Sequence, residues 1–158
     1  MAPLHETLAL LFAELVNGPA DAAYMLNPGD PGLLRSLDGL PSDAASRIPA
    51  SGGASIAAHV DHLCFGLELM NQWSAGNPDP WSDADWTASW RRTTVSDAEW
   101  TALRARLRDV TQRWHEALAS PRNMTPIELH TVIGSVAHLG YHLGAIRQID
   151  RSIRGPHA

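Results

Sequence analysis

Apolar residues recur every three to four positions in four long stretches of this chain, which is the spacing of helices with one buried face. The first stretch covers about Pro3 to Val16 and stops at Asn17-Gly18-Pro19. The second starts at Ser55 and closes at Gly76-Asn77-Pro78. The apolar positions that define these two helices are Leu8, Leu11, Phe12 and Leu15 in the first, and Ile56, Val60, Leu63, Leu67 and Met70 in the second.

The other two stretches begin with capping boxes, in which a Ser or Thr and a Glu three residues later satisfy each other's free backbone amides. The third begins at Ser96-Asp97-Ala98-Glu99 and continues to about Leu118. The fourth begins at Thr125-Pro126-Ile127-Glu128, with proline at the first helical position, where it is favoured. This last helix is predicted to end near Gly155-Pro156.

The segment between the first two helices has a different composition. Residues 19–54 are rich in Pro, Gly, Ser and Asp, and only Pro31–Leu37 suggests a short helix. No segment shows the alternation of a strand. Four long helices with one long connection predict an all-α fold, a four-helix bundle. At 158 residues the chain is expected to form a single domain, residues 1–158.

Composition argues against several classes of protein. The net charge is −5 and all twelve basic residues are Arg, so no broad basic surface indicates nucleic-acid binding, and Arg91-Arg92 is too short to indicate it. The single cysteine, Cys64, excludes an internal disulfide and a cysteine-rich zinc site, and we expect a buried, inert thiol. The N-terminal stretch lacks a basic region and contains Glu6 and Glu14, which argues against a signal peptide and favours a cytoplasmic location.

One segment is close to membrane-spanning length. Leu129–Ile146 contains no Asp, Glu, Lys or Arg. It nevertheless contains His130, His138, His142 and three glycines, and no other segment of the chain is similar. A buried central helix is therefore the better interpretation, and no membrane partner is expected.

Four of the eight histidines form two close pairs. His138 and His142 are four residues apart, so their side chains lie one turn apart on one helix face and can reach a single metal ion. His59 and His62 are three residues apart, and helical-wheel geometry places His59 nearer the middle of the apolar stripe. Buried neutral imidazoles need partners, so two pairs on uncharged helix centres favour a metal site.

The segments around these pairs resemble a known family. Residues 136–148 (VAHLGYHLGAIRQ) are similar to the C-terminal signature of the DinB/YfiT-like superfamily, whose members are regarded as metalloenzymes. Residues 55–63 (SIAAHVDHL) resemble the segment that carries the family's first ligand histidine. Residues 85–90 and 95–100 resemble the pattern of a subgroup, so the likeness spans nearly the whole chain.

This resemblance implies a four-helix bundle with one divalent transition metal, commonly zinc or nickel, held by three histidines. Carried over to this chain, the ligands are His138, His142 and His62, the last at the matching distance from Ser55 and followed by an aliphatic residue. His59, which the helical wheel favours, is the alternative to His62 or a supporting residue. Three imidazoles leave an open coordination position, which is typical of a catalytic site.

Relatives of this type include transferases and isomerases that use thiols such as bacillithiol or mycothiol, and also hydrolases. A hydrolase usually needs a carboxylate base near the metal, but Asp61 and Glu68 point away from His62 on the wheel. We therefore expect a metal-dependent enzyme acting on a small molecule, with transfer that uses a low-molecular-weight thiol slightly ahead of hydrolysis. The alternative is a non-catalytic, metal-stabilised bundle that acts as a binding or stress-response module. A homodimer is compatible with the resemblance.

Several other residues are candidates for contacts around the site. Tyr141 lies about 100° from the histidines on the helical wheel, so we expect it to contact a neighbouring helix or subunit. Arg147 and Gln148 are expected to cap the uncharged segment rather than orient an anionic substrate. Four tryptophans are expected to pin the connection between the second and third helices to the core, rather than form a lid: Trp81, Trp86, Trp90 and Trp100.

Overall fold

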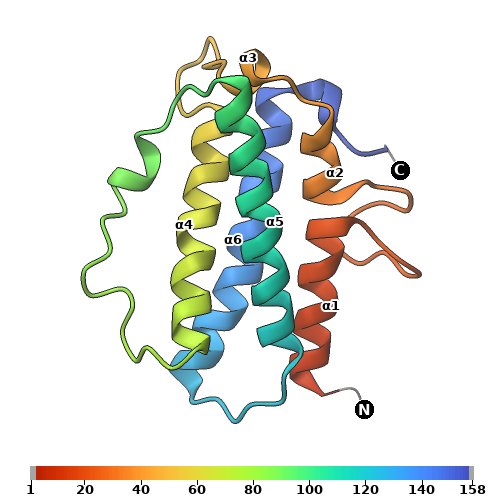
Figure 1. Cartoon of the computed structure of the whole chain (residues 1–158). Helices are drawn as coiled ribbons and strands as arrows, with labels where there is room; N and C mark the ends of the chain where they lie inside the picture. The colour runs from red at the N-terminus through yellow and green to blue at the C-terminus, as the bar shows by residue number, and fades with distance from the viewer. Residues whose placement is uncertain (1–2, 157–158) are drawn as a thin grey trace.

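The computed structural model describes residues 3–156 and shows a bundle of four long helices (Figure 1). Within that range the chain contains no strand, and α1 and α4 each pack against both α5 and α6. The predicted all-α fold is therefore confirmed. The long helices are α1 (Leu4–Asn17), α4 (Ile56–Ser74), α5 (Asp97–Ala119) and α6 (Pro126–Ile149); the short ones are α2 (Gly32–Asp38), α3 (Ser42–Ala45), and the 3₁₀ turns η1 (Ala88–Trp90) and η2 (Arg151–Ile153).

The helices begin where the local sequence predicts. The Ser55 hydroxyl accepts the Ala58 amide at 3.2 Å, and complete capping boxes start α5 at Ser96 and α6 at Thr125. The predicted end of α6 near Gly155 is wrong, because the helix stops at Ile149. Asp150 has an extended backbone and its carboxylate accepts the Ser152 amide, which starts η2 instead.

The core lies along the bundle axis and contains the predicted stripes. All five apolar positions named for the second helix are buried in α4, and those named for the first are buried in α1 except Leu11, which is half-buried. Trp100 on α5 is fully packed, and its indole N–H donates to the Leu40 carbonyl at 2.7 Å. This bond ties Leu40, two residues past α2, to α5, so Trp100 pins the connection between α1 and α4 and not the connection between α4 and α5 for which its role was predicted.

The connection between α1 and α4, residues 18–55, is fixed by two buried carboxylates. The Glu14 carboxylate accepts the backbone amides of residues 24, 25 and 26 at 2.7–2.9 Å. Asp30 forms a two-bond ion pair with Arg147 on α6 at 2.6 and 2.9 Å. Arg147 therefore holds this connection instead of capping α6. Gly18 has φ +86°, and a Cβ there would lie 2.0 Å from the Asp30 carbonyl oxygen, so only glycine fits.

The connection between α4 and α5, residues 75–96, runs back along the outer side of α4 (Figure 1). Its far end is tied down by the Ser55 hydroxyl, which donates to the Thr93 carbonyl at 2.6 Å, and by an ion pair between Arg92 and Asp61 at 3.2 Å. These contacts place η1 against α4, where the histidines lie. None of the described helices is both long and apolar enough to cross a bilayer.

Candidate metal centre

The structure brings His62 on α4 together with His138 and His142 on α6. The Nε2 atom of His138 lies 2.8 Å from that of His142 and 3.2 Å from that of His62. One nitrogen from each ring lies within 4.8 Å of the other two, and no carboxylate or thiol of residues 3–156 joins the group. The predicted three residues therefore converge, although their role as metal ligands stays a prediction.

The spacing of these nitrogens fits a transition-metal ion. Metal–imidazole bonds of about 2.0–2.1 Å in tetrahedral geometry separate neighbouring ligand nitrogens by about 3.3 Å. The two Nε2 separations in the structure, 2.8 and 3.2 Å, are close to this value. A set of three imidazole nitrogens suits zinc or nickel, since both accept nitrogen ligands.

Ser89 on η1 orients the first of the three rings. Its hydroxyl donates to the Trp86 carbonyl at 2.7 Å. Because its one proton is used there, the Ser89 oxygen must accept the hydrogen bond from Nδ1 of His62, which is also 2.7 Å away. The proton of His62 is therefore on Nδ1, and the lone pair of Nε2 points at the cluster. Hydrogen bonding at the far nitrogen is the usual way in which proteins orient a metal-binding histidine. Sequence reasoning missed Ser89, because no periodicity singles out one serine in an irregular connection.

His59 supports His142 instead of joining the cluster. The two Nδ1 atoms are 2.8 Å apart, so one ring donates to the other, and His142 keeps Nε2 directed at His138. Helical-wheel geometry favoured His59 over His62 as the inward residue, yet the two are equally buried, at 8% and 7% exposed. Of the two readings that the sequence left open for His59, its position fits that of a supporting residue.

Burial keeps all four histidines neutral near pH 7. Burial, followed by the charges of His138 and His59, lowers the pKa of His62 to about 4. The pKa of His142 falls to about 3, again mainly through burial and then through the other three histidines. Burial alone lowers the pKa of His59 and of His138. A neutral imidazole is the form that binds a metal ion, so the electrostatics favour metal binding over proton binding.

Two tryptophans of the 75–96 connection cover the cluster. The Trp90 ring stacks on His62 at 4.2 Å between centroids, and the Trp86 ring lies 5.7 Å from the same imidazole. Trp90 also meets His59 edge-on at 5.3 Å. Trp81 packs against Trp73 on α4. The prediction that these residues pin the connection is therefore incomplete, because Trp86 and Trp90 also form a wall of the site.

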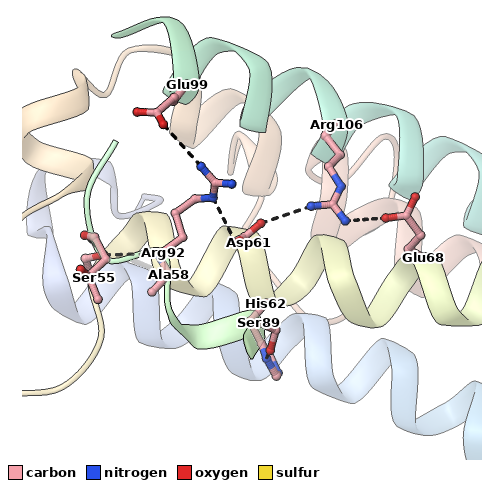
Figure 2. Close-up of polar contacts among 10 residues, drawn as sticks. Ser55, Ala58, Asp61, His62, Glu68, Ser89, Arg92, Glu99 and Arg106 are labelled. Atoms are coloured by element: carbon pink, nitrogen blue, oxygen red, sulfur yellow. Dashed lines mark hydrogen bonds and ion pairs between the residues drawn. The ribbon is translucent and has the colours of Figure 1, made fainter. Parts of the chain in front are cut away.

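The carboxylates of α4 lie on the opposite side of the helix, as the wheel predicted (Figure 2). Asp61 accepts from Arg92 and Arg106, at 3.2 Å each, and Glu68 accepts from Arg106. Figure 2 shows this chain of ion pairs between α4 and α5, while His62 projects from the other side of α4, where it meets Ser89 of η1. Neither carboxylate is available to the histidine cluster.

Two other residues named from the sequence lie outside the cluster. Cys64 is completely buried, and burial raises the pKa of its thiol to about 12, as expected of an inert residue. Tyr141 is 69% exposed, so its predicted packing against another helix of the chain is wrong. Its packing against another subunit stays a prediction.

The family comparison agrees with the geometry. The model of the DinB superfamily matches residues 32–145, a segment that contains the three clustered histidines and covers more than two thirds of the chain. No curated protein and no solved structure matches the chain. The resemblance drawn from the sequence motifs is thus confirmed at the level of the family, and this chain belongs to the DinB superfamily.

Proposed function

We propose that this protein binds one divalent transition metal, zinc or nickel, through His62, His138 and His142, and that it is a metal-dependent enzyme. The observation that carries the proposal is the direction of the rings. The Nε2 atoms of all three rings converge. The opposite nitrogen, Nδ1, is hydrogen-bonded to Ser89 in His62 and to His59 in His142. Gathering three buried ring nitrogens at one point is unfavourable unless each has a partner, which supports a metal ion there.

Access to the metal supports catalysis. Three ligands leave a coordination position free, and His62 and His138 form part of the wall of a cavity of about 380 Å³. A molecule in this cavity can therefore reach the proposed metal. When bound, the ion would supply a Lewis acid and keep a coordinated thiol deprotonated. The chain itself contributes neutral, oriented imidazoles and a largely apolar wall.

The surroundings favour thiol-dependent transfer over hydrolysis. A hydrolase needs a general base within hydrogen-bond reach of the reacting water. The two carboxylates of α4, Asp61 and Glu68, are bound to arginines on the far side of the helix. A thiol co-substrate needs no such base once a metal holds it as a thiolate.

Metal analysis of the purified protein and four variants tests the ligand set. We expect about one metal per chain in wild type, and loss of metal in His62→Ala and His138→Ala, since each removes one of three ligands. His59→Ala should keep metal with weaker affinity. His130→Ala is the matched control, because His130 lies exposed on α6 outside the cluster. A wild-type protein that takes up neither zinc nor nickel on reconstitution contradicts the proposal.

A non-catalytic, metal-stabilised bundle is the second candidate, because Trp90 stacks directly on His62 and covers one side of the cluster. Cobalt substitution distinguishes the two functions. In an enzyme, added azide or a small thiol should change the visible spectrum of the cobalt form, since the free position accepts a ligand. A spectrum that does not respond to either ligand would favour the non-catalytic bundle.

A further inference from the structure

The cavity beside the histidine cluster has a definite chemical character. Leu63, Leu67 and Met70 of α4 form one wall, and Trp81 and Trp86 of the 75–96 connection form another. The wall also includes two glycines, one on each of the helices that carry the clustered histidines, and the imidazole edges of two of those histidines. The lining is therefore aromatic and aliphatic apart from the site itself.

Among residues 3–156, no Asp, Glu, Lys or Arg side chain lines this cavity. The hydroxyl of Ser135, which lines the cavity, already has two partners, since it accepts from the indole N–H of Trp114 at 3.0 Å and donates its proton to the Val132 carbonyl at 2.7 Å. Arg92 and Arg106 are paired with Asp61 and Glu68 on the other side of α4. Arg122 lies over the Trp73 ring and donates to the Ser74 carbonyl, and it does not line the cavity. A charged substrate group lying against these walls would give up part of its water without gaining a polar partner, which is unfavourable.

The size of the cavity indicates what can fit inside it. A cavity of about 150 Å³ holds benzene, so about 380 Å³ is enough for a two-ring compound. Tryptophan rings and the Met70 thioether make favourable contacts with aromatic faces and edges. The two glycines, Gly66 and Gly134, provide space. A Cβ at Gly66 would lie 3.8 Å from His138 and Trp86, and one at Gly134 would meet no atom within 4 Å.

We propose that this cavity binds an uncharged aromatic substrate of one or two rings and presents it to the metal-binding cluster. The inference rests on the proposed function for the reaction that follows, but binding in the cavity does not require the metal. Gly134 is a specificity-determining residue in this proposal, since a larger side chain there would occupy the space that the ring needs.

The test compares three probes of similar shape by titration calorimetry with the full-length chain, before and after removal of metal by a chelator. Indole is uncharged, indole-3-acetate is an anion and tryptamine is a cation. We expect indole to bind the metal-free protein at least tenfold more tightly than either charged probe. Measuring the metal-free form prevents the carboxylate of indole-3-acetate from binding the metal and obscuring the result.

Two glycine variants locate the binding. Gly134→Leu should weaken indole binding at least tenfold, while Gly144→Leu should not change it. Gly144 is a matched control, because it is also exposed on α6, also has no atom within 4 Å of a built Cβ, and does not line the cavity. Gly66→Ala, which adds one methyl in ordinary contact with the cavity wall, should give a smaller loss and provides a second variant.

The outcomes separate this inference from the proposed function. Failure of indole to bind, equal affinity for the charged probes, or equal effects of the two leucine variants would overturn the inference even if the protein binds metal. Indole binding that is sensitive to Gly134→Leu, in a protein that never takes up metal, would support the cavity assignment and overturn the metal-dependent function.

Discussion

The two long connections of this bundle are held in place by different kinds of interaction. Residues 18–55 are fixed by charged groups, the Glu14 carboxylate under three backbone amides and the Asp30–Arg147 pair. None of these residues lines the cavity or belongs to the histidine cluster. Residues 75–96 are anchored at their far end in a similar way, but their middle rests on the histidines through Ser89, Trp86 and Trp90.

This difference separates stability from site chemistry. The first connection completes the core and is expected to contribute to folding alone. The second connection orients His62 and walls the cavity, so it is expected to contribute chiefly to metal affinity and substrate binding. Mutations in the two connections should therefore have separable effects.

The largest effect is expected from Asp30→Ala. This change leaves the Arg147 guanidinium buried without its partner, and its Nε already has none. Breaking a buried pair from one side costs about 3–5 kcal/mol of unfolding free energy. Denaturant unfolding measures the loss, and metal content should stay unchanged.

The exposed pair between Asp109 and Arg113 on α5 provides the control for Asp30→Ala. Asp109→Ala should cost less than about 1 kcal/mol, because water already screens that pair. Equal losses in the two variants would mean that the Asp30–Arg147 pair is not a special anchor of the first connection.

A smaller effect, of a different kind, is expected from Ser89→Ala. The variant removes the acceptor that fixes the tautomer and orientation of His62. Loss of such a partner typically weakens metal binding about 10- to 100-fold, while the unfolding free energy should change by about 1 kcal/mol. Competition with a chromophoric chelator measures the affinity.

Ser82→Ala is the matched control for Ser89→Ala, since Ser82 lies in the same connection but its hydroxyl bonds only to the Asp79 carbonyl. We expect wild-type metal affinity in this variant. A loss of affinity equal to that of Ser89→Ala would show that the connection acts as a whole and not through the hydrogen bond to His62.

The smallest effect is expected from mild acid. The pKa values of His62 and His142 are about 4 and about 3 in the folded chain, against about 6.5 when unfolded. The unfolded chain therefore binds more protons below about pH 6.5, and the unfolding free energy of the metal-free protein falls as pH is lowered toward the folded values. Between about pH 7.5 and about pH 6 the loss should stay under about 1 kcal/mol per histidine.

Denaturant unfolding at stepped pH checks this prediction, and His62→Gln should flatten the slope. The first connection contains no histidine. Burial raises the pKa of Asp30, but its bonds to Arg147 and Gly32 outweigh burial and leave the pKa lowered. Its contribution is therefore present above about pH 3.9 and lost below it. Stability that rises as pH falls from about 6.5 would contradict the assignment of neutral buried histidines.

The sequence by itself determined the long helices and the relation between two of the three clustered histidines. Capping boxes at Ser96 and Thr125 set the starts of α5 and α6 through bonds between residues three apart. A separation of four residues places His138 and His142 on one face of any helix that contains them. These features are local, so they do not depend on how the helices pack. The end of α6 is also set by local sequence, at Asp150, but a single Asp is a weak sequence signal for the end of a helix.

Helical periodicity could not decide which histidine of α4 joins them: the family resemblance pointed to His62, and the packing of the helices brings that ring to the cluster. The tertiary structure alone decided which residues hydrogen-bond to the far nitrogen of each ring. Whether His59 or His62 meets α6 depends on the rotation of one helix relative to the other, which periodicity leaves uncertain by about one residue, or about 100°. Ser89, Trp86 and Trp90 reach the cluster only because the 75–96 connection folds back along α4. Such contacts join residues far apart in the chain through packing and loop closure, and no repeating spacing in the sequence encodes them.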